Sequence, residues 1–230
     1  MARLFVDKIR SFARRYLIST DHQAVALQFF LVSALMIVGG VVLQARSRNL
    51  FALPGEPLPV AAWLLGSDNL FMPAVYHGLD AAGALVVVLL GAMAMSIGGL
   101  GTYLVPLQIG SPNMAFKQAQ RTALWLYVLA GILSIVGYWQ MIGSGLPVFP
   151  GRLLFQLGVF LAILALTALA INIIVTVIMY RIPAMTWSKL PLTVWTQLSA
   201  SITIVLLSAP ALSLTGLLIA DEAAAISVLG

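Results

Sequence analysis

The chain has 230 residues, of which 61% are hydrophobic and 8% are charged, and its net charge is +5. Because soluble domains carry roughly 25% charged residues, this composition excludes a soluble globular protein and indicates a membrane protein. The sequence contains no cysteine, which excludes disulfides, thiolate metal ligands and iron–sulfur clusters.

Five stretches lack Asp, Glu, Lys, Arg and His altogether: residues 23–45, 81–116, 122–151, 153–180 and 190–220. About 20 apolar residues cross a bilayer as a helix, so each stretch can hold one span. We predict an all-α, polytopic membrane protein with five transmembrane helices, near 24–45, 81–107, 122–144, 154–180 and 192–219. The predicted organisation is a basic interfacial segment at 1–22, a single five-helix transmembrane domain at 23–220 and a short outer tail at 221–230.

The basic residues predict the orientation of these spans. Nine fall on one side, namely Arg3, Lys8, Arg10, Arg14, Arg15, Lys117, Arg121, Arg181 and Lys189. Three fall on the other side, namely Arg46, Arg48 and Arg152. Cytoplasmic loops carry an excess of Lys and Arg, so we expect the N-terminus inside and the C-terminus outside. No basic stripe with interleaved aromatic residues indicates a nucleic-acid partner.

Small residues cluster in the second predicted span, at Gly83, Gly91, Ala92, Ser96, Gly98, Gly99 and Gly101. Small residues let helix backbones approach each other closely in lipid, so we interpret this cluster as a packing surface. No ionisable residue lies in any span core. Intramembrane ionisable residues are the usual marks of proton relays and ion paths, so a self-contained pump or proton-coupled transporter is not expected.

The two histidines cannot form a metal site together. His22 lies at the inner end of the first span and His77 at the outer end of the second, roughly 30 Å apart. A structural zinc or copper centre needs three or four ligands, so we predict no metal site made by this chain alone.

Five segments in order resemble one known family: ISTDHQAVALQFFL, GGLGTYLVPLQIGSPNMAF, INIIVTVIMYRIPAMT, PLTVW and LLSAPAL. Together they resemble the first five transmembrane helices of subunit I of the haem-copper oxidases, which include cytochrome c oxidases and quinol oxidases. The resemblance runs from about Leu17 to Asp221, and YLVPLQIGSPNMAF is its most specific part. The family's subunit I has about twelve helices, and the resemblance places its copper ligands and high-spin haem ligand beyond the part matched here.

The resemblance assigns the first ligand of the low-spin haem to a histidine on helix 2, fifteen residues before the first glycine of a GGFGN-like motif. That glycine is Gly98, so the ligand position is occupied by Gly83. His77 lies twenty-one residues before Gly98. Six residues of helix correspond to about 9 Å and one and two-thirds turns, so we expect His77 to be an interfacial histidine, and a haem ligand only if a haem is bound. Arg48 matches a family arginine that contacts this haem, and here we expect it to cap a helix or contact headgroups.

Other functional positions of the family also differ. The acid at the mouth of the main proton channel corresponds to Asn113, and two channel asparagines correspond to Thr102 and Gln120. The arginine and aspartate of the quinol site correspond to Gly39 and Leu43. The packing motifs are therefore kept while the redox and proton residues are replaced.

We therefore expect a non-catalytic, haem-free subunit, resembling cytochrome c oxidase subunit I, that anchors or assembles a larger respiratory electron-transfer complex. No cofactor is predicted for the chain alone, although partner subunits can carry haem or copper. The expected partners are lipids and other integral membrane and redox subunits, in an energy-transducing membrane such as the bacterial inner membrane. Two alternatives stay open: the N-terminal half of a naturally split terminal oxidase, and a haem- or quinone-binding subunit that uses His77.

Overall fold

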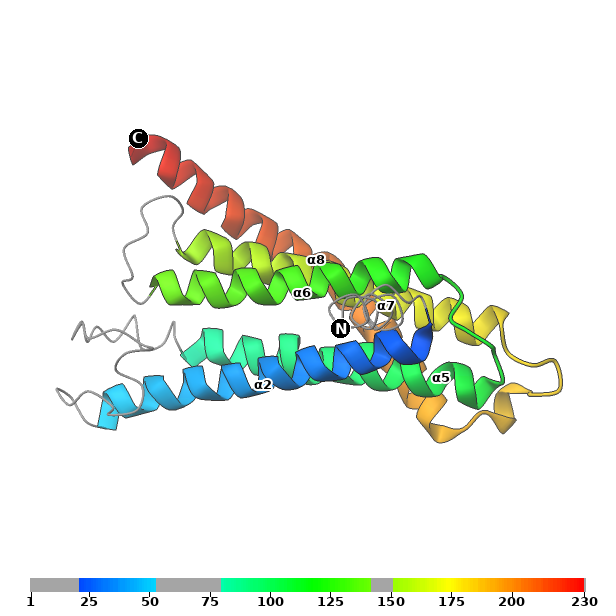
Figure 1. Ribbon diagram of the computed structural model, residues 1–230. Coiled ribbons are helices and arrows are strands. Elements are labelled where there is room, and N and C mark those ends of the chain that lie inside the picture. Colours follow the sequence, from blue (N-terminus) through cyan, green and yellow to red (C-terminus); the bar gives the residue numbers. More distant parts are fainter. Residues whose placement is uncertain (1–20, 53–79, 142–150, 230) are drawn as a thin grey trace, which may run out of the picture. The chain divides into compact units, whose positions relative to one another are not determined.

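The computed structural model describes residues 21–52, 80–141 and 151–229, and all of its long elements are helices (Figure 1). In chain order they are α2 (His22–Ala52), η2 (Val86–Met93), η3 (Met95–Gly101), α5 (Thr102–Ile109), α6 (Lys117–Met141), α7 (Gly151–Met179), the short 3-10 turn η4 (Trp187–Lys189) and α8 (Leu192–Leu229). The N-terminal segment predicted to lie at the interface, and most of the long connection that contains His77, fall outside the described residues.

Five helices in the described part are long and apolar enough to cross a membrane. They are His22–Val42, Asp80–Ile109, Lys117–Tyr138, Gly151–Met179 and Leu192–Ala224. The five predicted spans are therefore confirmed. Two helices run further than the expected spans, because α2 continues to Ala52 and α8 to Leu229. The residues predicted as an outer tail thus continue the last helix.

The second span, Asp80–Ile109, departs from regular α-helix over half of its length. Residues Val86–Met93 and Met95–Gly101 are wound as π-helix, and the regular α-helix α5 follows. α5 ends at Gly110, whose φ of 72° lies in the left-handed region that favours glycine. The amides of Gly110 and Ser111 both donate to the carbonyl oxygen of Pro106, which closes the helix end.

The described residues pack as two compact units, and each long helix except α5 contributes to both. The first unit contains 21–32, 93–125 and 165–208, and the second contains 33–52, 80–92, 126–141, 151–164 and 209–229. The most buried span is α7, in which 56% of the most apolar window is buried, against 11% in α8. Large apolar side chains of α8 such as Leu206 and Leu217 are each 70% exposed.

Candidate functional site

The loop between α5 and α6 is held against α7 by a side-chain clamp in the first unit. The amide nitrogen of Phe116 donates to Oδ1 of Asn172 at 2.9 Å, and Nδ2 of Asn172 donates to the carbonyl oxygen of Phe116 at 3.1 Å. One turn further along α7, Oγ1 of Thr176 accepts from the amide nitrogen of Ala115 at 3.0 Å. Asn172 and Thr176 are both buried. Two side chains of one helix face thus satisfy three backbone groups of a loop that has no regular structure of its own.

This clamp positions the segment that carries the most specific part of the family resemblance, SPNMAF. Within it, the Ser111 hydroxyl donates to the carbonyl oxygen of Asn113 at 2.6 Å. Asn113 takes the place at which the resemblance expects an acid. A side-chain amide carries no exchangeable charge near neutral pH, so position 113 cannot take up and release a proton as a carboxylic acid would.

The two other positions that the resemblance assigns to the proton channel are fully buried, with Thr102 and Gln120 both 0% exposed. The hydroxyl of Thr102, both amide atoms of Gln120 and Oδ1 of Asn113 have no hydrogen-bond partner among the described residues. The polar character of these positions is therefore retained in the first unit, whereas the titratable group is replaced.

In the second unit, α2 and the second span approach each other through glycines. A methyl group added at Gly40 would lie 2.6 Å from Cγ2 of Val87 and 2.9 Å from its backbone nitrogen. A methyl group at Gly83 would lie 2.7 Å from Cγ of Gln44 and 3.3 Å from its backbone nitrogen. Real Cβ atoms essentially never approach other atoms to less than 3.0 Å, as three of these four distances would require. These two helices therefore contact each other at backbone distance, as small residues permit in a membrane.

The same observation tests whether the expected position of the low-spin haem ligand fits a haem. Gly83 is buried, and a Cβ at this position would lie 2.7 Å from the side-chain Cγ of Gln44 on α2. The nearest α2 backbone atoms, the nitrogen of Gln44 and the carbonyl oxygen of Gly40, would lie 3.3 Å and 3.4 Å away. Glycine has no side chain to bind iron, and a histidine here would require the Gln44 side chain to move, so the residues present do not fit a haem ligand.

Three further glycines of the predicted packing surface also contact α2. A methyl group at Gly91 would meet Cγ1 of Ile37 at 2.5 Å, one at Gly98 would meet the ring of Phe29 at 2.5 Å, and one at Gly99 would meet the ring of Phe30 at 3.2 Å. All three partners lie on α2. The glycines thus line up against one neighbouring helix within each unit.

A buried tyrosine in the second unit joins three helices and was not identified from the sequence. Tyr127 of α6 is 0% exposed, and its hydroxyl hydrogen bonds with Oγ of Ser33 on α2 and donates to the carbonyl oxygen of Leu90. Leu90 lies in η2, where the π-helical winding changes the usual pairing of backbone carbonyls. A lone tyrosine in an apolar run gives no signal of such a role.

The described residues do not test the two cofactor positions predicted from the sequence. His77 lies outside the described residues, and Arg48 lies on the described backbone of α2 while its side chain is not described. His22 is 5% exposed at the start of α2, and its Nδ1 lies 3.3 Å from Oδ1 of Asp21. Within the described ranges, no group of three or more His, Cys, Asp or Glu side chains is placed to hold a metal ion.

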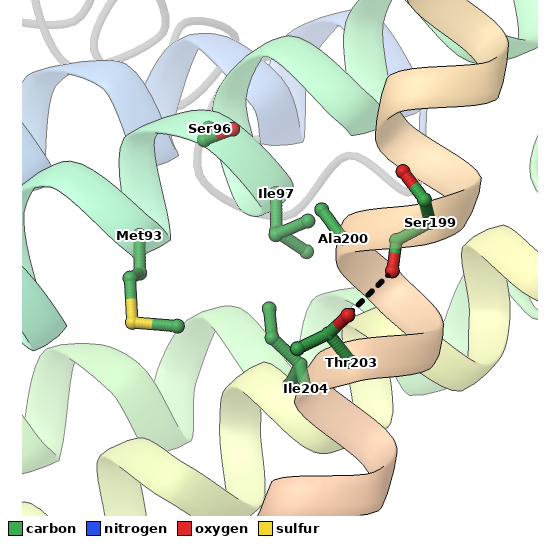
Figure 2. A pocket seen from close by; sticks show the side chains of 7 residues that line it. All are labelled: Met93, Ser96, Ile97, Ser199, Ala200, Thr203 and Ile204. Carbon is green, nitrogen blue, oxygen red and sulfur yellow. Dashed lines mark hydrogen bonds between the residues drawn. The ribbon is translucent and has the colours of Figure 1, made fainter.

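A cavity of about 350 Å³ lies between the second span and α8 in the first unit (Figure 2). Its lining residues are Met93, Ser96, Ile97, Ser199, Ala200, Thr203 and Ile204. The hydroxyl of Ser199 donates to the carbonyl oxygen of Thr196, and that of Thr203 donates to the carbonyl oxygen of Ser199, each at 3.0 Å. The lining contains no acid, base or charged group, so this cavity can bind an apolar group but cannot catalyse a proton or nucleophilic transfer.

Comparison with known proteins places these features in one family. The family described as "Cytochrome C and Quinol oxidase polypeptide I" matches residues 24–229 of this chain. That match covers all five spans and the clamped loop. It also covers the positions at which glycine and asparagine replace the expected histidine and acid.

Individual relatives agree with the family match. The chain is 27% identical over 219 residues to the alternative cytochrome c oxidase subunit 1 of Bradyrhizobium diazoefficiens, covering 88% of this chain and 35% of that protein. It is 28% identical over 212 residues to the heme-copper oxidase subunit I+III of Aeropyrum pernix, covering 84% of this chain and 24% of that protein. It is 25% identical over 206 residues to the cytochrome c oxidase subunit 1 of Thermostichus vulcanus, covering 85% and 35%. The chain therefore spans about a quarter to a third of the length of these curated relatives.

Proposed function

Because the chain belongs to the family of cytochrome c and quinol oxidase polypeptide I, we propose that it is a haem-free, non-catalytic membrane subunit of a respiratory electron-transfer complex. The observation that carries this proposal is the packing at Gly83. Glycine stands where the family resemblance expects the low-spin haem ligand, and the Gln44 side chain of α2 fills the space next to it, 2.7 Å from where a Cβ would begin. A catalytic subunit I needs that haem, whereas a scaffold needs only the helix packing that the glycines supply.

The proton-channel positions support the same proposal. Asn113 stands where the resemblance expects an acid, and no charged residue occurs in the core of any span. A proton path through lipid depends on groups that can exchange protons or hold ordered water. The clamp on the 115–116 backbone keeps the loop in place even though its acid is replaced. The task of this segment is then structural.

The role of an anchoring subunit is supported by the exposed apolar surface of α8, which is the least buried span. In lipid, helix association depends on close packing and interhelical hydrogen bonds. We propose that the partners are other integral membrane and redox subunits, which carry any haem or copper, in an energy-transducing membrane such as the bacterial inner membrane.

A second candidate is favoured by the lengths of the relatives. Since this chain corresponds to about a third of the first relative, a separate polypeptide that supplies the remaining helices would make it the N-terminal part of a split oxidase. The packing at Gly83 opposes this candidate, because the reconstituted enzyme would lack one ligand of its low-spin haem.

Native purification distinguishes these candidates. The chain is tagged, purified in mild detergent and examined by a reduced-minus-oxidised visible spectrum, and the co-purifying proteins are identified by mass spectrometry. The His77→Ala variant is purified in parallel, and Gly83→His tests whether the position accepts a ligand. The anchoring function predicts redox subunits in the eluate, an unchanged spectrum in His77→Ala and no new haem band in Gly83→His.

Loss of a haem band in His77→Ala would show that His77 is a ligand and would overturn the haem-free function. A co-purifying polypeptide with the copper and high-spin haem ligands, together with oxygen reduction by the complex, would establish the split oxidase instead. Absence of any redox subunit from the eluate would contradict the anchoring function.

A further inference from the structure

The segment between α7 and α8 places an arginine and two tryptophans in contact at one membrane face. The guanidinium carbon of Arg181 lies 4.1 Å from the centroid of the Trp187 ring. The ring centroids of Trp187 and Trp195 are 5.9 Å apart, and their planes are inclined by 45°. A cation over an indole face is attracted by the ring quadrupole, so Trp187 holds the guanidinium in a fixed position.

The guanidinium has hydrogen-bonding capacity that the described residues do not use. Nη1 of Arg181 is buried and has no hydrogen-bond partner among the described residues. The ion pairs in the described ranges join Asp21 with His22 and Arg152 with Glu222, and Arg181 takes part in neither. A buried donor without a partner costs free energy, and a guanidinium presents a planar fork of donors suited to a phosphate. The site therefore lacks an anionic acceptor.

The surroundings of Arg181 are apolar and exposed. Tyr180, Ile182, Leu192 and both tryptophan rings are among the exposed large apolar side chains of the chain. They lie where α7 ends and α8 begins, next to the limits of two transmembrane helices. Aromatic side chains at such positions lie at the depth of lipid headgroups. An acceptor that reaches Arg181 from this side comes from the headgroup layer.

A second cation lies within the same short turn. Lys189 is the last residue of η4, which begins at Trp187. Its side chain is exposed, and no ion pair joins it to any described acidic residue. The basic-residue distribution predicts that this face is the inner one, where anionic lipids give the membrane surface its negative potential.

We propose that Arg181, Trp187 and Lys189 form a binding site for the phosphate of an anionic phospholipid. Arg181 donates to the phosphate oxygens, Trp187 fixes the plane of the guanidinium, and Lys189 adds charge at the rim. The exposed apolar side chains around the site contact the glycerol backbone and the first methylenes of the acyl chains. This site is independent of the proposed function, since it requires neither haem nor redox partners.

The test measures the thermal unfolding midpoint of the full chain, purified with its accompanying subunits in an uncharged detergent. Phosphatidylglycerol and phosphatidylcholine with identical acyl chains are added separately. A ligand that binds only the folded state raises the midpoint, so phosphatidylglycerol is expected to raise it by a few degrees and phosphatidylcholine to leave it nearly unchanged. Arg181→Gln is expected to lose most of the phosphatidylglycerol shift. Arg152→Gln, which removes an arginine outside the site, is the matched control and is expected to keep the shift.

Three results would overturn the proposal: an equal shift with both lipids, an unchanged phosphatidylglycerol shift in Arg181→Gln, or the same shift produced by millimolar inorganic phosphate alone. The last result would show a site for free phosphate. If Arg181→Gln does not fold, Lys189→Gln decides the matter, because its side chain is exposed. Lys189→Gln is expected to reduce the shift by about half, and a full shift would contradict the proposal.

Discussion

The side-chain amide of Asn172 on α7 bonds to both backbone polar groups of Phe116, at 2.9 Å through Oδ1 and at 3.1 Å through Nδ2. The Asn172 side chain supplies the acceptor for the Phe116 N–H and adds a second donor to the Phe116 carbonyl, which also accepts from the Gln120 amide of α6 at 3.1 Å. The 56 positions that separate the two residues in the chain make this a tertiary contact, which fixes the α5–α6 connection to the centre of the first unit.

Asn172→Leu is expected to destabilise the chain by about 1–2 kcal/mol, because it removes both hydrogen bonds and leaves the backbone N–H of Phe116 unpaired, while the Phe116 carbonyl keeps only its bond from the Gln120 amide. The measurement is the unfolding free energy in mixed micelles under SDS titration. Thr196→Ala is the matched control, since Thr196 is exposed and its hydroxyl bonds only within its own helix. Equal stability of Asn172→Leu and the wild type would show that the clamp contributes nothing.

The two adjacent glycines of α2 offer a sharper test of helix packing. Gly40→Ala is expected to lower the free energy of unfolding of the chain by about 1–3 kcal/mol, since the added methyl group would overlap Val87 of the second span. Gly39→Ala meets nothing within 4 Å, and it is expected to be neutral or to stabilise by up to about 1 kcal/mol through helix propensity. The same SDS titration measures both variants. Similar effects in the two variants would contradict the close approach of these helices.

Tyr127→Phe removes a single oxygen that joins α6, α2 and the second span. The free energy of unfolding is expected to fall by about 1–2 kcal/mol, because the Ser33 hydroxyl and the Leu90 carbonyl each lose a hydrogen-bond partner. A double-mutant cycle with Ser33→Ala isolates the interaction between the two side chains. A coupling energy indistinguishable from zero would show that Ser33 and Tyr127 do not act together.

The ion pair between Arg152 and Glu222 is expected to matter little. Its atoms Nε and Oε1 are 2.9 Å apart, and the pair opens to solvent on the arginine side, since the Arg152 side chain is 67% exposed while that of Glu222 is 16% exposed. Exposed ion pairs contribute about 0–1 kcal/mol and are screened by salt. Glu222→Gln should therefore change the thermal midpoint by a degree or less, and any difference should shrink as the salt concentration rises. A large decrease in the thermal midpoint that does not depend on salt would indicate that the pair is shielded from solvent.

The membrane spans could be predicted from the sequence because their cause is local: five long stretches without charge must lie in lipid. The ends of the helices could not be predicted as well. Hydropathy indicates which residues lie in lipid, but a helix can continue beyond the membrane as long as its backbone hydrogen bonds continue. Arg46, Arg48, Asp221 and Glu222 are polar enough to end a span, yet α2 and α8 continue through them. The inside placement of the N-terminus stays a prediction.

The candidate site was predicted in part. The small residues of the second span indicated close packing, but the sequence does not name the partner, and the structure shows α2 against most of them. Asn172 and Thr176 can be recognised in the sequence as polar residues within a span. Their hydrogen-bond partners are backbone groups of a distant loop, and only the tertiary fold brings these together. The π-helical winding of Val86–Gly101 has no pattern of its own in the sequence, because its composition matches that of an ordinary apolar helix.

The last helix is attached by polar contacts at its two ends. Near its start, the hydroxyl of Thr193 donates to Oε1 of Gln108, and near its end Glu222 pairs with Arg152. Between these contacts only 11% of its most apolar window is buried. Acyl chains can therefore cover most of the apolar surface of this helix, while the contact at each end ties it to a neighbouring helix.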